Sequence, residues 1–189
     1  PPGRAQYTCW CDEEGFVLQD GVVLQVREGV YWLTAAEPTL RYFRVVARQI
    51  GAEVEIEDVS KSYGILALQG PRAHEVIRQL TDAATCLRYF GATDAEIEGH
   101  PVIITRTGYT GDLGYELWIE SEDACSVWDA LMEAGSGHNI TPIGTTALKM
   151  ARVEAGLLLM GTDFHSARFA WVDAQRETPS ELGWSWMFK

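Results

Sequence analysis

Hydrophobic and polar residues alternate in short runs over the first part of the chain, and this pattern predicts β-strands. The runs 16–18, 22–26 and 30–34 are rich in valine, leucine and aromatic residues. An Asp-Gly pair at 20–21 and a Glu-Gly pair at 28–29 separate them, and such pairs are typical of tight turns. We therefore expect a meander of three strands.

The next apolar residues recur at helical spacing. They lie three or four positions apart from Leu40 to Ile50, after Pro38 and before Gly51. Proline favours the first turn of a helix and glycine follows its end, so a helix is expected between these two residues.

Strand and helix patterns alternate along the rest of the chain. The expected strands are 54–58, 65–69, 100–106 and a strand-like run at 182–187. The expected helices begin at the Gly-Pro pair 70–71, at 124 and after the Pro-Ile-Gly segment 142–144, and the last two end near 134 and 154. Val127, Trp128 and Leu131 would form the inner face of the helix at 124–134.

The order of these elements repeats. Strands, a helix and further strands occur around 16–69 and again around 95–134. Expected strands outnumber expected helices and short turns join most of them, which favours an α+β architecture with antiparallel sheets. We therefore expect two antiparallel-sheet α/β sandwich halves.

The composition argues against several classes of partner. The chain carries 27 acidic and 15 basic residues, a net charge of -12. Such a surface repels phosphate backbones and anionic lipids, so we expect neither nucleic acid nor a membrane as partner. No apolar run approaches the ~20 residues that span a bilayer. The four cysteines are too scattered for a disulfide framework, so a reducing, cytoplasmic setting is expected.

The most informative segment runs from Arg106 to Ile119. Glycines at 108, 111 and 114 make a tight loop, and an alternating strand with one carboxylate, Glu116, follows directly. A carboxylate can accept two parallel hydrogen bonds from an N–H/NH2 edge, so Glu116 faces either water or a ring-binding pocket. Tyr109 either stacks on a ligand or packs on its own sheet.

Other chemistry-bearing residues give weaker signals. Arg152, near the end of a helix, could clamp a carboxylate with its guanidinium, and Asp20 is either a turn residue or an acid with a function. The Cys9-Trp-Cys11 pair has no second metal-binding pair. The histidines show neither metal spacing nor a nucleophile partner, and the glycine patterns of nucleotide sites are absent.

Five motifs occur in an order found in a known family. They are Asp12 to Val22, the Gln-Gly-Pro turn at 69–71, the segment 106–116, the Arg-Val-Glu-Ala-Gly-Leu run at 152–157, and Thr178 to Gly183. Together they resemble the tetrahydrofolate-dependent one-carbon transferases typified by the glycine-cleavage T-protein, an aminomethyltransferase. The resemblance covers nearly the whole chain.

The resemblance implies a three-domain ring around a central folate cavity. Residues 1–70 would be the remainder of the first α/β folate-binding domain and residues 71–177 the second. Residues 178–189 would start the connection to a C-terminal β-barrel domain, which is absent from this chain. We expect both ends of the chain to lie within a longer protein.

The resemblance also implies a set of cofactor-binding residues for tetrahydrofolate. Glu116 matches the acid that grips the amino-pyrimidine edge of the pterin, and Tyr109 matches a tyrosine that lines the cavity. Arg152 matches an arginine near the folate or its tail, and Tyr7 matches a tyrosine before the first hairpin.

The catalytic role falls on Asp20, with Tyr109 as a second catalytic residue. Asp20 matches the second member of the family's acidic pair, whose first position is Gln19 here. An ionised acid beside folate N5 would orient the nucleophile and stabilise developing positive charge. The sequence Gly-Asp-Leu-Gly-Tyr-Glu resembles the family's methyl-ether demethylase branch. In that branch, Tyr109 would help to move a proton.

The expected reaction is therefore transfer of a methyl group from a small-molecule donor, a methyl ether or a related compound, to folate N5. The alternative is the aminomethyltransferase reaction of the T-protein, which takes its group from a lipoyl carrier protein and releases ammonia. A non-catalytic folate-binding module and the folate domain of a flavin amine oxidase are further alternatives.

Overall fold

The computed structural model describes residues 2–187, and the chain forms two compact units. Unit 1 comprises Pro1–Ala5, Gln25–Gly29 and Val59–Leu157. Unit 2 comprises Gln6–Leu24, Val30–Asp58 and Leu158–Lys189.

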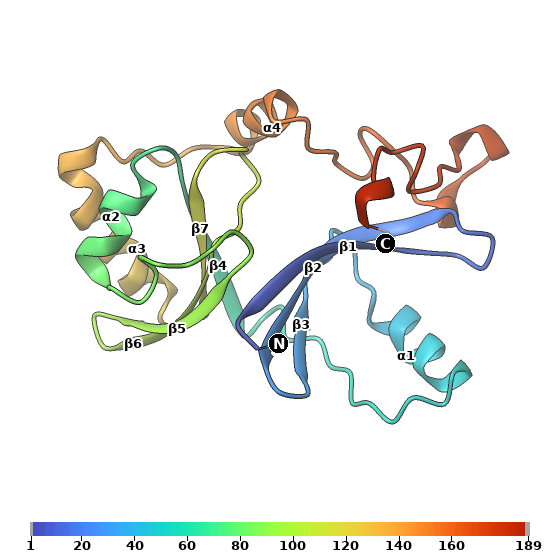
Figure 1. Ribbon diagram of the computed structural model, residues 1–189, viewed down its shortest axis with the longest axis horizontal. Coiled ribbons are helices and arrows are strands. Elements are labelled where there is room, and N and C mark those ends of the chain that lie inside the picture. The colour runs from blue at the N-terminus through green and yellow to red at the C-terminus, as the bar shows by residue number, and fades with distance from the viewer. Residues whose placement is uncertain (1, 188–189) are drawn as a thin grey trace. The chain divides into compact units, whose positions relative to one another are not determined.

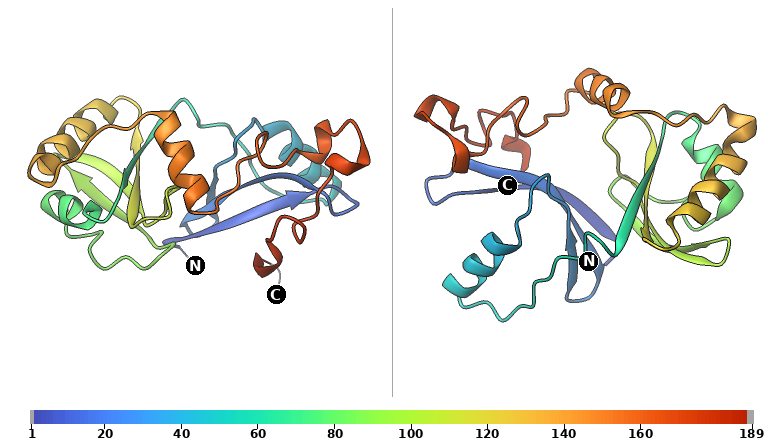
Figure 2. Two further views of the ribbon diagram at one scale, coloured as in Figure 1. Left: turned by 90° about the horizontal axis from the view of Figure 1, so that it is seen from above. Right: turned by 180° about the vertical axis from the view of Figure 1, so that it is seen from behind.

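Unit 1 contains a four-stranded sheet with two helices on one face (Figure 1). Its strands are β4 (Tyr63–Gln69), β5 (Ala92–Ile97), β6 (His100–Thr105) and β7 (Gly114–Glu120). They pair in the order β4-β7-β6-β5, and each neighbouring pair is antiparallel. The helices on that face are α2 (Ala73–Leu80) and α3 (Ala124–Gly135), which further views show beside the sheet (Figure 2). The antiparallel α+β architecture expected from the sequence is confirmed.

Alternation along β7 divides its residues between the two faces of this sheet. Tyr115, Leu117 and Ile119 are buried in the core that also contains Val127 of α3. Because successive side chains of a strand point to opposite faces, Glu116 lies on the face that α2 and α3 leave uncovered. The core thus fixes the direction of the carboxylate.

The last helix of unit 1 begins where the sequence predicts. After α3 the chain makes the 3-10 turn η1 (Ser136–His138) and then forms α4 (Thr145–Glu154). Gly144 precedes α4, and Gly156 follows it with a φ of 72°, a left-handed conformation that favours glycine.

Unit 2 combines most of a second sheet with a helix and an irregular C-terminal segment. The strands are β1 (Arg4–Cys11), β2 (Val17–Arg27) and β3 (Val30–Leu33), in the order β1-β2-β3, and the helix is α1 (Leu40–Gln49). The C-terminal segment makes three 3-10 turns, η2 (Ala167–Phe169), η3 (Asp173–Gln175) and η4 (Ser185–Met187). Val17 of β2 is buried with Phe164 and Trp184, so this segment supplies much of the core of unit 2.

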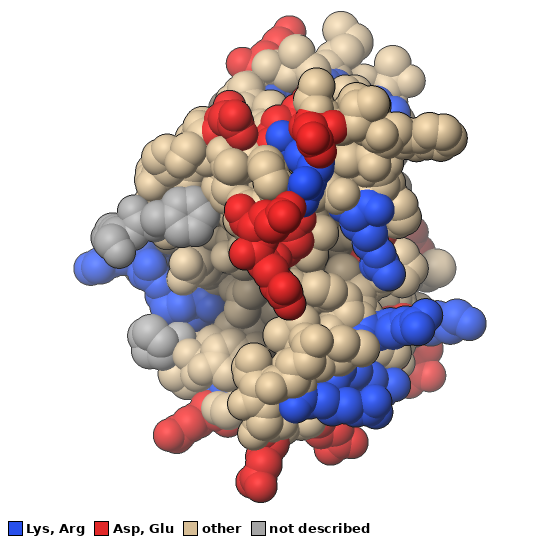
Figure 3. Space-filling view, turned by 90° about the vertical axis from the view of Figure 1, so that its right-hand side faces the viewer, with Lys and Arg blue, Asp and Glu red and all other residues tan. Residues whose placement is uncertain are grey.

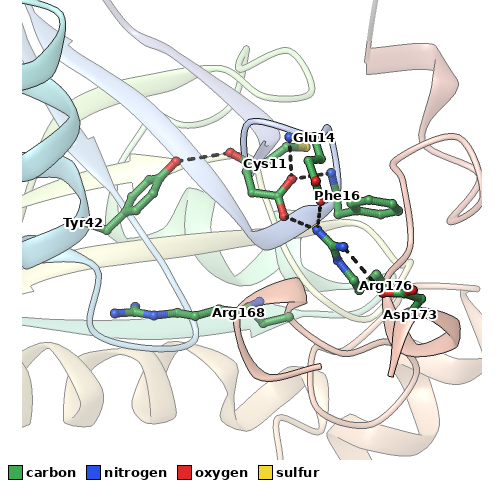
Figure 4. A network of polar contacts seen from close by, with 9 residues as sticks. Cys11, Glu14, Phe16, Tyr42, Arg168, Asp173 and Arg176 are labelled. Carbon is green, nitrogen blue, oxygen red and sulfur yellow. Dashed lines mark hydrogen bonds and ion pairs between the residues drawn. The ribbon is translucent and has the colours of Figure 1, made fainter. Parts of the chain in front are cut away.

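Arg176 attaches the C-terminal segment to the β1–β2 turn (Figure 4). Its guanidinium forms ion pairs with Asp12, at 3.2 Å, and with Glu14. It also lies over the ring of Phe16, with its central carbon 4.1 Å from the ring centroid. The N–H of Val17 donates to the carbonyl of Glu177 at 2.8 Å, which holds the neighbouring backbone in place.

Two expectations for unit 2 are wrong. The Asp-Gly pair at 20–21 is not a turn, because β2 continues through it. A Cβ at Gly21 would lie 1.9 Å from the carbonyl oxygen of Thr34, so this glycine permits close approach of a neighbouring segment. The segment 54–58 is not a strand; Arg44 of α1 donates from two guanidinium nitrogens to the carbonyl of Ile56, at 3.0 and 2.6 Å.

Two further expectations need correction. The run 182–187 is not a strand, because Trp184 turns into the core beside Phe164 and the chain closes in the turn η4. Trp128 is not on the inner face of α3, where Val127 and Leu131 are buried; its side chain is 42% exposed.

The surface reflects the excess of acidic residues. Acidic side chains gather in the middle of the face shown in Figure 3, with basic side chains around them. Among residues 2–187, no helix is both long enough and apolar enough to span a membrane.

Candidate functional site

Glu116 lies on the face of the unit 1 sheet that α2 and α3 leave uncovered. Its partners across the ladders are Ala67 on β4 and Thr105 on β6, and their side chains share this face. Glu116 is half-buried and Ala67 is exposed. Burial raises the pKa of Glu116, and a hydrogen bond from Thr107 lowers it in part. The site is therefore a partly desolvated carboxylate with small, uncharged neighbours.

A chain of hydrogen bonds ends on this carboxylate. The hydroxyl of Thr107 donates to Oε2 of Glu116. Oγ1 of Thr105 lies 2.6 Å from Oγ1 of Thr107, and Nε1 of Trp118 donates to Oγ1 of Thr105 at 3.2 Å. Thr105, Thr107 and Trp118 are 1%, 5% and 7% exposed, so the chain is shielded from water while Glu116 is not.

Gln69, at the end of β4, shapes the glycine loop before β7. A Cβ at Gly108 would lie 1.9 Å from Oε1 of Gln69, and one at Gly114 would lie 2.0 Å from it. Nε2 of Gln69 donates to the carbonyls of Thr107 and Tyr115, at 3.2 and 3.1 Å. These two glycines are therefore needed because the Gln69 side chain lies against their backbone.

The third glycine of the loop has a different neighbour. Gly111 has a φ of 78°, and a Cβ there would lie 2.5 Å from Cβ of Ala155, just after α4. The loop is thus shaped by side chains of unit 1 itself.

The other predicted residues of unit 1 lie in distinct surroundings. Tyr109 is half-buried within the glycine loop. Arg152 of α4 is buried, at 4% exposed, and its Nη1 donates to the carbonyl of Leu157 at 3.1 Å. This bond fixes the end of α4, so at least one nitrogen of the guanidinium has a structural function.

In unit 2 the structure joins two of the predicted residues. The hydroxyl of Tyr7 on β1 donates to Oδ2 of Asp20 on β2, at 2.6 Å. Burial raises the pKa of Asp20, and the bond from Tyr7 lowers it in part. The ring of Tyr7 meets Trp184 edge-on at 5.8 Å and stacks on Trp186 at 6.3 Å, so aromatic side chains hold the donor in place.

The residues next to Asp20, in sequence or in space, mainly pack within unit 2. Gln19 is 4% exposed and lines a cavity of about 30 Å³ with Trp10 and Tyr42. Cys9 and Cys11 pack against the core formed by Val17, Phe164 and Trp184. Burial raises the pKa of Cys9 to about 11, which keeps its thiol protonated.

Sequence reasoning missed Thr107, Thr105 and Gln69. Gln69 reaches the motif from the paired strand β4, which no local pattern shows. Thr105 and Thr107 lie two residues apart, but their sequence spacing does not reveal that their hydroxyls meet. The one available signal was the Gln-Gly-Pro turn at 69–71, which places an amide at the end of β4 but does not reveal its partner.

Comparison with known proteins supports the resemblance. The family model of the GCVT N-terminal domain matches residues 1–188. The chain belongs to this family. It is 38% identical to an aminomethyltransferase of Geobacillus kaustophilus over 94% of its own length and 52% of the relative's. It is 35% identical to the Bacillus subtilis aminomethyltransferase over 86% of its length and 46% of the relative's.

The chain also matches a curated protein of another name and, separately, a solved structure. A trimethylamine-oxide aldolase of Ruegeria pomeroyi is 33% identical over 87% of this chain, which covers 22% of that protein. The crystal structure of the glycine cleavage system aminomethyltransferase T from Bartonella henselae superposes with a TM-score of 0.76 at 22% identity. That match covers 98% of this chain and 47% of the other, and it shows a shared fold. The chain spans about half the length of the aminomethyltransferases it matches.

Proposed function

We propose that the chain forms the folate-binding part of a tetrahydrofolate-dependent aminomethyltransferase. Membership of the GCVT family and the aminomethyltransferases among its relatives support a one-carbon transferase. The observation that carries the proposal is Glu116, a half-buried carboxylate held by Thr107 on the sheet face opposite α2 and α3.

The chemistry of Glu116 fits the amino-pyrimidine edge of tetrahydrofolate. An ionised carboxylate has about four acceptor positions, of which Thr107 uses one. The remaining positions can accept two parallel N–H bonds from the ring, a geometry that gives orientation as well as affinity. The exposed, small side chain of Ala67 beside Glu116 leaves room for a flat ring.

Asp20 is proposed as the acid that acts on the transferred group. Its Oδ2 is held by Tyr7, and the carboxylate so positioned would orient folate N5 and stabilise positive charge. Burial raises the pKa of Asp20, and a raised value favours an acid that can also hold a proton. Tyr7 is accordingly a cofactor-binding residue and a positioning residue for Asp20.

Tyr109 and Arg152 complete the proposed set. The half-buried ring of Tyr109 would contact the ligand and assist proton movement, and Arg152 would contribute its guanidinium near the folate tail. We retain as a proposal that residues 1–70 and 71–177 correspond to two domains of the three-domain ring. A lipoyl carrier protein would then be the partner that delivers the aminomethyl group.

Methyl transfer from a small-molecule donor is the less favoured reaction. Methyl transfer was expected first because residues 111–116 resemble the demethylase branch. The curated aminomethyltransferases, by contrast, match most of the chain at 35% and 38% identity. These matches favour the aminomethyl reaction.

The product distinguishes the two reactions. The protein is incubated with tetrahydrofolate and either an aminomethylated lipoyl carrier or a panel of methyl ethers and methylamines. We expect methylenetetrahydrofolate and ammonia with the carrier, and loss of both with Asp20→Asn. Methyltetrahydrofolate formed from a small donor, with no product from the carrier, would refute the aminomethyl proposal.

A further inference from the structure

The hydrogen-bond chain that ends on Glu116 has only one orientation when the carboxylate is ionised. An ionised carboxylate can only accept, so Thr107 must donate its single proton to Oε2. Thr107 can then only accept from Thr105, 2.6 Å away. Thr105 in turn accepts from Nε1 of Trp118, an indole nitrogen that can only donate. The proton of Thr105 points to Thr107 at 2.6 Å, with the carbonyl of Glu116 as a longer second acceptor at 3.4 Å, so each hydroxyl in the chain both donates and accepts.

This arrangement differs from a chance contact between a threonine and an acid. Thr105 and Thr107 are almost completely buried, so water does not compete for their protons. Thr105 is fixed by its pairing opposite Glu116, and Trp118 lies two residues further along β7 on the same face. The sheet itself therefore holds the donor chain in register with the carboxylate.

We propose that Thr107, oriented by Thr105 and Trp118, is a positioning residue that keeps Oε2 of Glu116 a hydrogen-bond acceptor and so selects ring edges that present N–H donors. A ring with a carbonyl or an apolar group at that edge would displace water from the carboxylate without offering it a donor, and such desolvation of a charge is unfavourable. Selection at this position therefore depends on a residue that does not touch the ligand's ring. The inference rests on the proposed function in one respect, that the ring is the pterin of tetrahydrofolate.

Among the groups around Glu116, the hydroxyl of Thr107 is the one whose removal should change the pKa of this carboxylate most. The side chains opposite Glu116, Ala67 and Thr105, are uncharged. Burial raises the pKa of Glu116, and the Thr107 hydroxyl is the group that lowers it. Removing that hydroxyl should therefore raise the pKa of Glu116 further.

The first test needs no ligand. The pKa of Glu116 is measured by carbon NMR of its carboxyl group in the wild type, Thr107→Val, Thr107→Ser and Thr110→Val. Thr110 is the matched control, because it lies in the same loop and its hydroxyl faces Gln69 at 3.4 Å. We expect a higher pKa in Thr107→Val alone. An unchanged pKa in Thr107→Val would overturn the proposal, whatever the protein binds.

The second test measures selectivity. Affinities are compared for tetrahydrofolate and for its analogue with a methyl group in place of the 2-amino group. A hydrogen bond to a charged group corresponds to roughly tenfold to hundredfold in affinity, and we expect the wild type and Thr107→Ser to prefer tetrahydrofolate by about that factor. Thr107→Val should lose most of this preference; a retained preference would overturn the proposal.

A second variant guards against misfolding of Thr107→Val. Trp118→Phe removes the first donor of the chain and keeps an aromatic ring in place, and it should move both readouts in the same direction by a smaller amount. No effect of a folded Trp118→Phe on either readout would count against the chain. If the wild type binds no tetrahydrofolate while the pKa result holds, the proposed function fails and the positioning by Thr107 stands.

Discussion

The contact between Gln69 and the glycine loop can be tested by a double-mutant cycle with Gly108. In the wild type, a Cβ at position 108 would lie 1.9 Å from Oε1 of Gln69, so Gly108→Ala must displace that side chain. Displacement breaks the two bonds from Gln69 to the carbonyls of Thr107 and Tyr115. At about 1 kcal/mol for each bond, Gly108→Ala should cost about 2–3 kcal/mol.

In the Gln69→Ala background the obstacle is gone. Gln69→Ala alone should cost about 2–4 kcal/mol, because it removes the same two bonds and leaves a cavity. Adding Gly108→Ala should then cost little, so the two changes should show a coupling energy of about 1.5–3 kcal/mol.

The assay is equilibrium unfolding of the four proteins in urea, with Gln79→Ala as a surface control on α2. Gly108 has no positive φ, so backbone strain does not explain a large effect of alanine. Costs of Gly108→Ala that are equal in both backgrounds would refute the explanation that Gln69 makes the glycine necessary.

Three further predictions concern charged residues. Because burial raises the pKa of Glu116, its ionised form destabilises the fold as pH rises through that pKa, and Glu116→Gln should stabilise the ligand-free protein by about 0.5–2 kcal/mol at pH 7 in thermal unfolding. Tyr7→Phe should raise the pKa of Asp20 further, measured by carboxyl NMR, because it removes the larger of the two hydrogen bonds that lower this pKa. Burial raises the pKa of Asp12, but hydrogen bonds from Phe16 and Arg176 outweigh burial, so the net shift of this pKa is downward. The ionised carboxylate of Asp12 therefore stabilises the folded state, and that stabilisation is lost as pH falls through the folded pKa. The melting-temperature difference between wild type and Arg176→Met should therefore shrink in acid and stay constant near neutrality.

Local sequence patterns predicted those helices and strands that depend on residues close to one another in the sequence. Helix α1 follows from apolar residues at helical spacing and ends before Gly51, which has a φ of 68°. Strand β4 and helix α2 follow equally well, because alternation and helical stripes depend on residues close in sequence. The same reasoning singled out Glu116, and the structure places it, half-buried, on the sheet face opposite α2 and α3; its contact with a ligand stays a prediction.

The errors have a common physical origin in contacts between distant residues. Gly21 looks like a turn glycine in the sequence, yet its purpose is close approach to Thr34 within a continuous strand. The glycines at 108 and 114 were expected as part of a tight loop, and what the sequence did not show is that they also make room for Gln69 from another strand. A glycine pattern shows that space is needed, and only the fold shows which group occupies it.

The measurement that tests the central claim most directly is the affinity of tetrahydrofolate for the wild-type chain and for Glu116→Gln by titration calorimetry. Gln keeps the shape of the side chain and loses its charge, and Glu122→Gln, an exposed residue after β7, is the control. We expect binding that weakens by roughly tenfold or more in Glu116→Gln and is unchanged in the control. Equal affinity of the wild type and Glu116→Gln would contradict this expectation.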